Sequence, residues 1–377
     1  MSKIRTGIVG LGIIGSGRLE EYCDFHKENP DDIEVKAICD IDEKKLNELG
    51  DKFGIPKENR YTHIGKMLKE ADINTVDVCL HNNMHAPVAI AAMEAGKDVY
   101  SEKPMAGSYA DALAMYETMK RTGKKLHVQM WSLYSNETKA AKRYIDNGDL
   151  GHIYHMRSYG FRRRGRPYVD GYGSKEFDNT KTAGGGALFD MGVYHIAQLL
   201  YLTGLPELER VTGTTYQELD MNEERRKISD FNVEELGVGF ATYKGGLTLD
   251  IIEAWAINAG PFMSSMIAGS KGGVTLSPFK YHTIQNDLEV NTDADLGSME
   301  FFDHTVYADT NSFHDSSAKH WVAALLGKVE LIESAKIALN TQLVQEGIYL
   351  SKKLGREVTA DEIKAMSKSI ALDIPNL

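Results

Sequence analysis

The sequence has few cysteines and no long apolar run. Its three cysteines, Cys23, Cys39 and Cys79, show no paired spacing and lie in segments that we expect to form one helix and two buried strands. We interpret them as small core residues in a reducing compartment rather than as a disulfide framework. No segment approaches the ~20 apolar residues of a membrane span, and none resembles a signal peptide. We therefore expect a soluble, cytoplasmic protein.

Positive charge is also in deficit, with 43 Lys and Arg against 54 Asp and Glu and a net charge of -11. This balance disfavours nucleic acid or an anionic membrane as a partner and favours a small-molecule ligand. The histidines show no H-E-x-x-H spacing, and His81 and His85, although four residues apart, lack a nearby carboxylate partner. We therefore expect no metal site.

A length of 377 residues with 42% hydrophobic content allows two domains with their own cores. In residues 1–130 short apolar runs alternate with amphipathic stretches. Strands are predicted at 6–9, 35–39, 75–80, 98–101 and 125–129, and helices at 15–28, 43–53, 64–69, 87–95 and 109–121. This rhythm predicts βαβ units and an α/β, doubly wound parallel sheet of the Rossmann kind.

The pattern changes in residues 131–377, which contain no internal repeat. Strand-like runs at 153–161, 211–216, 236–243, 247–256 and 266–268 follow one another with Gly-rich turns, and helices are predicted at 189–201, 318–326 and 334–354. This second part is expected to be an α+β domain with a large, mostly antiparallel open sheet.

Three glycines follow the first predicted strand in the spacing G-x-G-x-x-G, at Gly10, Gly12 and Gly15. In such a turn the first Gly permits a tight bend, the second lets the backbone approach a pyrophosphate, and the third lets helix and strand pack closely. The following helix N-terminus, which includes Ile13 and Ile14, then presents free N–H groups to the phosphates. These five residues are our candidates for phosphate binding.

The second strand ends in Asp40, where a carboxylate can accept hydrogen bonds from a ribose 2′-OH and repel a 2′-phosphate. NAD is therefore favoured over NADP. Asp40 lies 28 residues after Gly12, beyond the usual ~20, so Asp42 stays a second candidate. Residues 80–85 follow the next strand and precede a predicted helix, which places them at the carboxyl edge of the sheet, where ligands of such folds bind.

Two further elements are Glu102-Lys103-Pro104 and the run Gly-Gly-Gly-Ala-Leu-Phe-Asp-Met-Gly at 184–192. With the glycine turn and the Asn-His segment at 82–85, their order makes the whole chain resemble the Gfo/Idh/MocA oxidoreductases. The resemblance implies a Rossmann domain, an open-sheet domain for substrate binding and oligomerisation, a nicotinamide cofactor in the cleft and usually a sugar, inositol or related polyol as substrate.

The resemblance also implies roles for single residues. Lys103 matches the family's active-site lysine and Asp190 its substrate-side carboxylate, while Asn83 and His85 match the loop near the nicotinamide. Glu102 belongs to the same cofactor-side corner as Lys103.

Many members carry a histidine four residues after the Asp, but here that position is Tyr194 and His195 follows it. In a regular helix Tyr194 shares a face with Asp190, whereas His195 falls on a stripe with Met191 that faces the core. An irregular first turn would instead bring His195 to the site. Both stay candidates for the acid/base, with Tyr194 favoured.

Hydride leaves a carbinol carbon readily only when its hydroxyl is losing a proton, so the site needs a base and a cation for the developing alkoxide. Lys103 supplies the cation. A tyrosine, with an unperturbed pKa of ~10, needs a nearby ammonium to act as base, and a pair of Lys103 and Tyr194 would meet that need. Asp190 could bind a substrate hydroxyl or hold Lys103.

Two features near the second domain are weaker candidates. Residues 161–167 hold four arginines in an Arg-Arg-Arg-Gly-x-Pro context, and a similar loop in some relatives approaches cofactor and substrate. Arg163 and Arg164 are therefore candidates for holding the nicotinamide or a polar substrate, with a solvated loop as the alternative. Trp131 could stack on a sugar face or be plain core.

The expected function is NAD-dependent oxidation of a secondary ring hydroxyl of a sugar or glycoside, with C3 of a glucoside preferred on family-level similarity alone. Such a ketone acidifies neighbouring C–H bonds, so a downstream lyase could then eliminate an aglycone. The alternatives are an inositol or trans-dihydrodiol dehydrogenase and a non-catalytic regulator that binds NAD and sugar. A homo-oligomer is expected, because open sheets in the family commonly pair.

Overall fold

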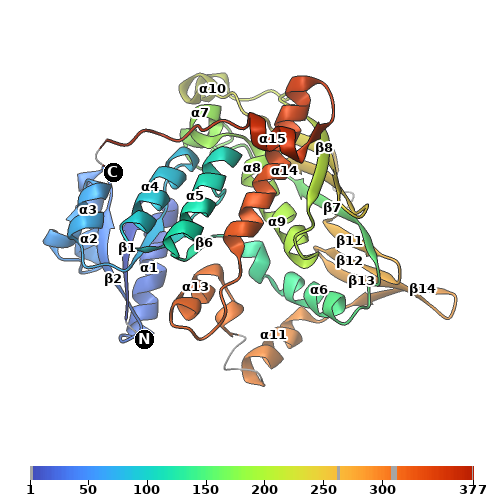
Figure 1. The fold of residues 1–377 in the computed structure, drawn as a ribbon, viewed down its shortest axis with the longest axis horizontal. Coiled ribbons are helices and arrows are strands. Elements are labelled where there is room, and N and C mark those ends of the chain that lie inside the picture. The colour runs from blue at the N-terminus through green and yellow to red at the C-terminus, as the bar shows by residue number, and fades with distance from the viewer. Residues whose placement is uncertain (1–2, 261–263, 307–311, 376) are drawn as a thin grey trace. The chain divides into compact units, whose positions relative to one another are not determined.

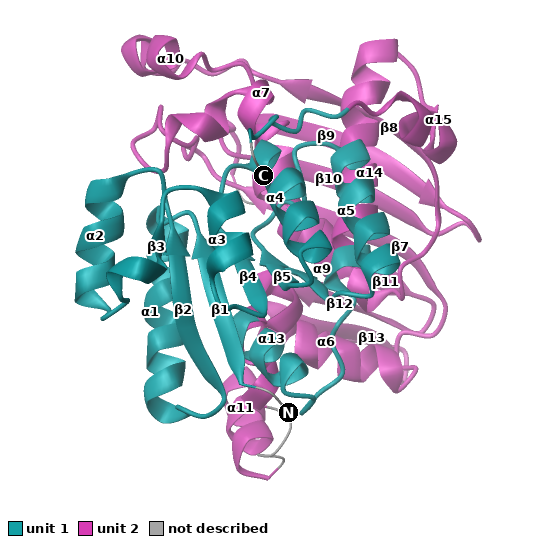
Figure 2. Ribbon diagram, turned by 60° about the vertical axis from the view of Figure 1, so that its left-hand side comes forward, with its two compact units in different colours: residues 1–129, 318–336, 369–377 teal, residues 130–317, 337–368 magenta. Residues whose placement is uncertain are grey.

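A computed structural model describes residues 3–260, 264–306, 312–375 and 377. The chain forms two compact units (Figure 2): unit 1 comprises residues 1–129, 318–336 and 369–377, and unit 2 comprises residues 130–317 and 337–368. Over the described ranges no helix has the length and apolar character needed to cross a membrane. The same ranges hold no group of His, Cys, Asp and Glu side chains placed to bind a metal ion.

Unit 1 is built on a parallel six-stranded sheet in the order β3-β2-β1-β4-β5-β6. Its strands are β1 (Ile4–Val9), β2 (Ile33–Cys39), β3 (Arg60–Tyr61), β4 (Thr75–Val78), β5 (Asp98–Ser101) and β6 (Leu126–Val128). Its helices are α1 (Ile13–Glu28), α2 (Glu43–Lys52), α3 (Ile64–Glu70), α4 (Asn82–Glu94), α5 (Tyr109–Thr122) and α13 (Ser317–Leu325), with a 3₁₀ turn η1 (Lys57–Asn59) (Figure 1). This strand order reverses between β1 and β4, which places the ligand-binding edge at the carboxyl ends of those two strands.

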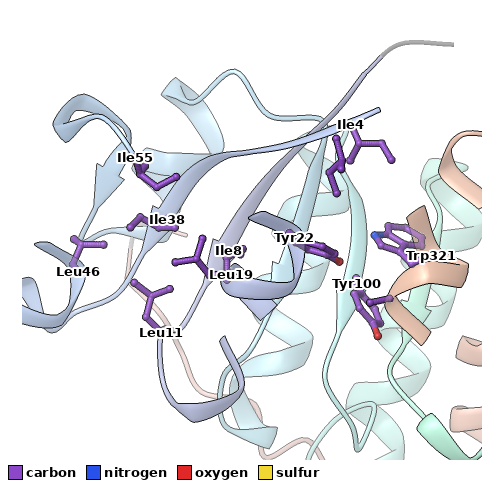
Figure 3. Packing of buried hydrophobic residues seen from close by; sticks show 12 residues of the cluster. Ile4, Ile8, Leu11, Leu19, Tyr22, Ile38, Leu46, Ile55, Tyr100 and Trp321 are labelled. Atoms are coloured by element: carbon purple, nitrogen blue, oxygen red, sulfur yellow. The ribbon is translucent and has the colours of Figure 1, made fainter. Parts of the chain in front are cut away.

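The core of unit 1 joins residues far apart in the sequence. Ile8 of β1 and Tyr22 of α1 are buried together with Tyr100 of β5 and Trp321 of α13 (Figure 3). Because Trp321 packs here, residues 318–336 return to the first unit, and residues 369–377 also return. The units therefore divide the chain differently from a single boundary after residue 130.

Unit 2 is built on a nine-stranded sheet in the order β14-β13-β12-β11-β7-β10-β9-β8-β15, in which β7 and β10 pair in parallel and the other described neighbours pair antiparallel. Its strands are β7 (Ile153–Phe161), β8 (Leu208–Tyr216), β9 (Leu236–Tyr243), β10 (Thr248–Ala254), β11 (Met266–Gly269), β12 (Gly272–Leu276), β13 (Phe279–Gln285), β14 (Leu288–Asp293) and β15 (Val358–Thr359). Its helices are α6 (Asn136–Asp146), α7 (Thr180–Ala183), α8 (Ala187–Asp190), α9 (Gly192–Leu202), α10 (Glu223–Ser229), α11 (Leu296–Thr305), α14 (Ser334–Leu354), which begins in unit 1, and α15 (Ala360–Met366), with 3₁₀ turns η2 (Trp131–Tyr134), η3 (Lys175–Asp178) and η4 (Ser312–His314). The expected α/β class, a parallel sheet plus a mostly antiparallel one, is confirmed.

The two faces of the second sheet differ. On one face a Cβ added to Gly239 of β9 would lie 2.6 Å from the side chain of Ile348, so the lack of a side chain at this position lets α14 pack closely. On the other face Arg157 pairs with Asp250 at 2.6 Å and Phe240 is exposed. One face therefore supports helices, while the other carries charge and an exposed aromatic ring.

Two local predictions are wrong at helix starts. The helix expected at 87–95 begins at Asn82, so Asn83 and His85 lie in its first turn rather than in a loop before it. The helix expected at 189–201 is interrupted, because α8 ends at Asp190 and α9 begins at Gly192. Tyr194 N bonds to the carbonyl oxygen of Met191, three residues back, so the first turn of α9 is tighter than an α-helix.

Candidate active site residues in the two units

The glycine turn after β1 has the geometry of a phosphate cradle. Gly10 has a φ of +87°, and a Cβ added to Gly15 would lie 1.7 Å from the carbonyl oxygen of Gly10, so both positions require glycine. A Cβ on Gly12 would meet nothing within 4 Å. Gly12 is the N-cap of α1, and as a glycine it has no side chain to cap the helix. The first N–H groups of α1 are thus uncapped beside open space, and Ile13 and Ile14 next to them are exposed.

Asp40 stands at the carboxyl end of β2 and is tied to that turn. Its Oδ2 accepts a hydrogen bond from Leu11 N at 2.6 Å, and its Oδ1 accepts one from Asp42 N at 2.9 Å. Each carboxylate oxygen keeps further acceptor capacity for a ligand hydroxyl. Asp42 caps α2, where its Oδ1 accepts from Lys45 N at 3.1 Å. The geometry therefore favours Asp40 over Asp42 for the ribose.

These residues fit a dinucleotide. The open cradle at Gly12 accommodates phosphate against uncapped N–H groups, and Asp40 presents a carboxylate at the neighbouring strand end. A 2′-phosphate beside that carboxylate would be repelled, which agrees with NAD rather than NADP.

A buried charge cluster lies behind the Glu102-Lys103 corner. Arg18 of α1 lies 3.1 Å from Asp77 of β4 and 3.1 Å from Glu102, with all three side chains almost fully buried. The guanidinium also lies 4.2 Å from the centre of the Tyr100 ring. Burial raises the pKa of Glu102 and of Asp77, whereas the Arg18 charge lowers both. The carboxylate of Glu102 thus pairs with Arg18.

Lys103 follows this cluster and is partly buried. The next residue, Pro104, is held by His85, whose Nδ1 lies 2.8 Å from the Pro104 carbonyl oxygen and whose Nε2 lies 3.0 Å from that of Leu80. His85 is fully buried, and burial lowers its pKa to about 4. A neutral His85 has one ring N–H and therefore donates to one of these two carbonyl oxygens at a time. Asn83, in the same helical turn, is also buried.

In unit 2, side chains at the end of strand β10 form hydrogen bonds with Asp190 and His195. Trp255, directly after the strand, donates its indole N–H to Asp190 Oδ2 at 2.9 Å. Two residues earlier, Glu253 lies 3.0 Å from His195 Nδ1 through each carboxylate oxygen. Residues two apart on a strand share a face, so one strand end anchors both predicted side chains. The break between α8 and α9 brings them there despite their five-residue spacing.

His195 has the arrangement typical of a general acid/base, with one ring nitrogen bonded to a carboxylate. Its side chain is 25% exposed, whereas Glu253 is fully buried. Among the described residues His195 Nε2 has no hydrogen-bond partner, so the second ring nitrogen is available to a ligand. Burial lowers the pKa of His195, but the Glu253 carboxylate offsets this and the net pKa is raised, with Arg162 opposing.

The triple-glycine segment before Asp190 is fixed by another buried carboxylate. Glu234 accepts hydrogen bonds from Gly186 N and Leu188 N, both at 2.9 Å, and from the hydroxyl of Tyr349 at 2.8 Å. A Cβ on Gly186 would lie 2.0 Å from the Glu234 carbonyl oxygen, so this position needs glycine. Burial raises the pKa of Glu234. The segment is thus a rigid support for α8 rather than a free loop.

The remaining candidates in unit 2 are Trp131, Tyr194 and the arginine run. Trp131 is 53% exposed, which excludes the plain-core alternative, and its ring centre lies 5.6 Å from that of Tyr194. Arg163 and Arg164 are exposed, and Arg164 is 3.4 Å from Asp170. Arg166 is the structural member of the run, because it is buried between Asp170 at 2.9 Å and Glu235 at 2.8 Å.

Within each unit the structure brings predicted residues together. In unit 1 the glycine turn is tied to Asp40, and His85 and Glu102 support the Lys103 corner. In unit 2 Asp190 and His195 bond to Trp255 and Glu253 at the end of β10, and the ring of Tyr194 lies near that of Trp131. The sequence reasoning missed Arg18, Asp77, Glu234, Glu253 and Trp255. The sequence did carry a signal for two of them, because Asp77 and Glu253 are carboxylates inside predicted strands rich in apolar residues, and a buried charge calls for a partner.

Comparison with known families accounts for both units. Residues 4–130 match the oxidoreductase family with an NAD-binding Rossmann fold, and residues 138–275 match the Gfo/Idh/MocA C-terminal domain. The chain belongs to the Gfo/Idh/MocA oxidoreductases. It is an NAD-dependent enzyme of that family, which confirms the predicted family, enzyme class and cofactor.

Individual relatives extend the comparison. The chain is 26% identical to D-glucoside 3-dehydrogenase of Escherichia coli (strain K12) over 95% of this chain and 97% of the relative. It is 31% identical to inositol 2-dehydrogenase of Salmonella typhimurium, over 41% of this chain and 46% of the relative. A levoglucosan dehydrogenase structure in complex with NADH and L-sorbose superposes with a TM-score of 0.77 at 19% identity, covering 96% of this chain and 99% of that one. The last likeness shows a shared fold.

Proposed function

We propose that this enzyme oxidises a secondary ring hydroxyl of a sugar or glycoside to a ketone, with C3 of a glucoside as the position attacked. The support is the match to D-glucoside 3-dehydrogenase over nearly the full length of both chains. His195 in unit 2, which is hydrogen-bonded to Glu253 and partly exposed, supplies the chemical support for this proposal, because alcohol oxidation needs a base at the hydroxyl.

His195 is the proposed proton acceptor. With its Nδ1 on Glu253, the lone pair of the neutral ring lies on Nε2, and this nitrogen takes the substrate hydroxyl proton. Tyr194 is the other candidate, and its phenol needs a neighbouring cation to ionise at neutral pH. The ordered carboxylate partner of His195 now favours the histidine.

Lys103 of unit 1 and Asp190 of unit 2 are the other proposed catalytic residues. The Lys103 ammonium stabilises the alkoxide that develops as the hydroxyl proton leaves. Asp190, oriented by the Trp255 indole, accepts a hydrogen bond from a neighbouring substrate hydroxyl. Trp131 and Tyr194 offer aromatic faces to the sugar ring or its aglycone. The hydrogen of the carbinol C–H bond leaves with both bonding electrons as a hydride, the O–H proton goes to His195, and a C=O bond forms.

NAD, when bound, supplies the hydride acceptor. We propose that the amides beside Gly12 to Gly15 hold its pyrophosphate and that Asp40 holds its adenosine ribose. Asn83 and the backbone around Glu102 in unit 1, and Arg163 and Arg164 in unit 2, are the further residues proposed to bind the cofactor.

A second candidate is oxidation of an inositol, favoured by the match to inositol 2-dehydrogenase over part of the chain. A trans-dihydrodiol is a third possible substrate class, because the tyrosine four residues after Asp190 suits it. Both would use the same proton acceptor and cation. A regulator that binds NAD and sugar without turnover is the remaining alternative.

Incubation of the purified protein with NAD and a panel of methyl and aryl glucosides, inositols and diols tests these proposals. NADH formation with glucosides, and a 3-keto product by NMR, would support the first. NADH formation with inositols or diols alone would replace it with the second or third. Saturable sugar binding without reduction of NAD would favour the regulator. The matched control is the His195→Gln variant, which should bind NAD normally but show at least ~10²-fold slower turnover.

Three wider expectations stay predictions: a cytoplasmic location, a homo-oligomer and a downstream lyase that eliminates the aglycone from the ketone. Sedimentation of the purified protein tests the second. The third requires that a purified 3-keto glycoside be cleaved by a separate enzyme that leaves the unoxidised glycoside intact.

A further inference from the structure

Glu253 occupies a niche that two glycines leave open. Its register partner on β7 is Gly160, where an added Cβ would lie 1.9 Å from Glu253 Oε2 and 3.0 Å from His195 Cε1. At the start of α9, a Cβ on Gly192 would lie 3.1 Å from Glu253 Cγ. Strand and helix thus both lack a side chain where the carboxylate and the imidazole meet.

The carboxylate of Glu253 contacts the imidazole of His195, which becomes its counterion when the ring is protonated. Ser158, on β7, donates its hydroxyl to Glu253 Oε1 at 2.6 Å, and His195 Nδ1 lies 3.0 Å from both oxygens. Within the described part of the chain no lysine or arginine forms an ion pair with Glu253, which is fully buried. A buried charge is costly unless it is paired, so the pairing with His195 stabilises the site.

We propose that Glu253, supported by Ser158, is the positioning residue that makes His195 the proton acceptor of the reaction. This inference rests on the proposed function. Glu253 acts through the imidazole and not on the substrate. It keeps the Nδ1 proton in place, so that the Nε2 lone pair is free, and it stabilises the imidazolium that forms when the substrate proton arrives.

The charged groups around His195 set the sign of the pH dependence. Glu253 on β10 raises the pKa of His195, whereas burial and Arg162, directly after β7, lower it, and the net pKa lies above its ordinary value. Asp190 on α8 is held by Trp255, and Ser158 on β7 is uncharged. Oxidation needs neutral His195, so its rate should rise with pH through this raised pKa.

The test is the pH profile of kcat/KM for glucoside oxidation in Glu253→Gln. Loss of the charge should move the acidic limb to lower pH by ~1 unit or more. The rate on the plateau should fall roughly 10²-fold, because the amide can donate to Nδ1 and leave the proton on Nε2. Ser158→Ala is the matched control: it keeps the charge, so its limb should stay within ~0.5 unit of the wild type with only a small loss of rate.

A measurement without turnover separates this inference from the proposed function. The imidazole of His195 is titrated by ¹⁵N NMR in the wild-type protein and assigned by its loss in His195→Gln. A pKa above the ordinary histidine value, with the neutral ring protonated on Nδ1, supports the pairing even if no glucoside is oxidised. An ordinary or depressed pKa, or a Glu253→Gln rate that falls equally at all pH values without a shift of the limb, would overturn it.

Discussion

The guanidinium of Arg18 lies 3.1 Å from the carboxylate of Glu102, and both side chains are buried. The same guanidinium pairs with Asp77, so one cation links helix α1, strand β4 and the corner before Lys103. Removing one partner of a buried pair leaves an uncompensated charge, which costs far more than the pair contributes over an apolar replacement.

Arg18→Met should therefore lower the free energy of unfolding by roughly 3–5 kcal/mol, measured by urea denaturation. The deficit should be larger at pH 8 than at pH 5, because Asp77 and Glu102, whose pKa values burial already raises, can take up protons at the lower pH. Arg121→Met is the control, since its ion pair with Glu94 is exposed and should contribute little. Equal stability of the two variants would contradict the role of the cluster.

The glycine turn yields a prediction that separates binding from folding. Gly12→Ala adds a methyl group that meets nothing in the protein, so stability should be unchanged, while the Kd for NAD should rise roughly 10-fold or more because the pyrophosphate needs that space. Gly15→Ala would place its Cβ 1.7 Å from Gly10 O and should lower the free energy of unfolding by ~1–3 kcal/mol. Calorimetric titration with NAD and urea denaturation measure the two effects. Normal NAD binding by Gly12→Ala would refute the cradle.

Much of unit 1 could be predicted because its signals are local. Strand β1, the glycine spacing and the acidic end of β2 all lie within residues 4–40. The link from Arg18 to Asp77 spans 59 residues and that to Glu102 spans 84, so no local pattern could show that the three charges meet. The packing of Trp321 in the core of unit 1 is hidden for the same reason.

Unit 2 was harder to predict because its decisive features depend on sheet register. The pairing of His195 with Glu253 depends on two features together: the interruption of the helix after Asp190, and the alternation of side chains between the two faces of β10. The hairpin of β13 and β14 was missed although Asn286 and Asp287 carried a signal, since both adopt positive φ, as a tight hairpin turn requires. Its strands are largely exposed and lack the apolar alternation on which strand prediction depends.

Asp40 and Asp42 make a matched pair for cofactor choice. Asp40→Asn removes the charge at the strand end, so the KM for NAD should rise roughly 10-fold and the preference for NAD over NADP should fall. Asp42→Asn keeps a good N-cap for α2 and should change neither stability nor cofactor preference. Initial rates with both cofactors provide the measurement, and a change of preference in Asp42→Asn instead would reassign the ribose contact.

Lys103 should affect turnover rather than cofactor binding. Lys103→Ala removes the proposed cation at the developing alkoxide, so kcat should fall roughly 10²-fold or more, while the Kd for NAD stays within a few fold. Lys69→Ala, at an exposed lysine of α3, controls for the loss of charge. Wild-type turnover in Lys103→Ala would remove the lysine from the proposed chemistry.

The buried Asp178 at the end of η3 should make stability depend on pH. Burial, helped by the charges of Asp170 and Glu176, raises its pKa to about 7, although the Ser229 hydroxyl and the Arg166 charge oppose the rise. An unfolded Asp titrates at ~3.9, so between about pH 4 and pH 7 the folded state holds a proton that the unfolded state has lost. The free energy of unfolding must then fall as pH rises through this window and level off above it.

Asp178→Asn removes this titration and should leave a side chain that is neutral at every pH. The variant should therefore gain stability relative to the wild type between pH 5 and pH 8, by roughly 2 kcal/mol, as measured by urea denaturation at both pH values. Asp361→Asn, whose side chain is 96% exposed, is the control and should show no such change. If the difference between Asp178→Asn and the wild type were the same at both pH values, the carboxyl would have to be charged in the folded protein, and a cation would have to lie closer to it than Arg166.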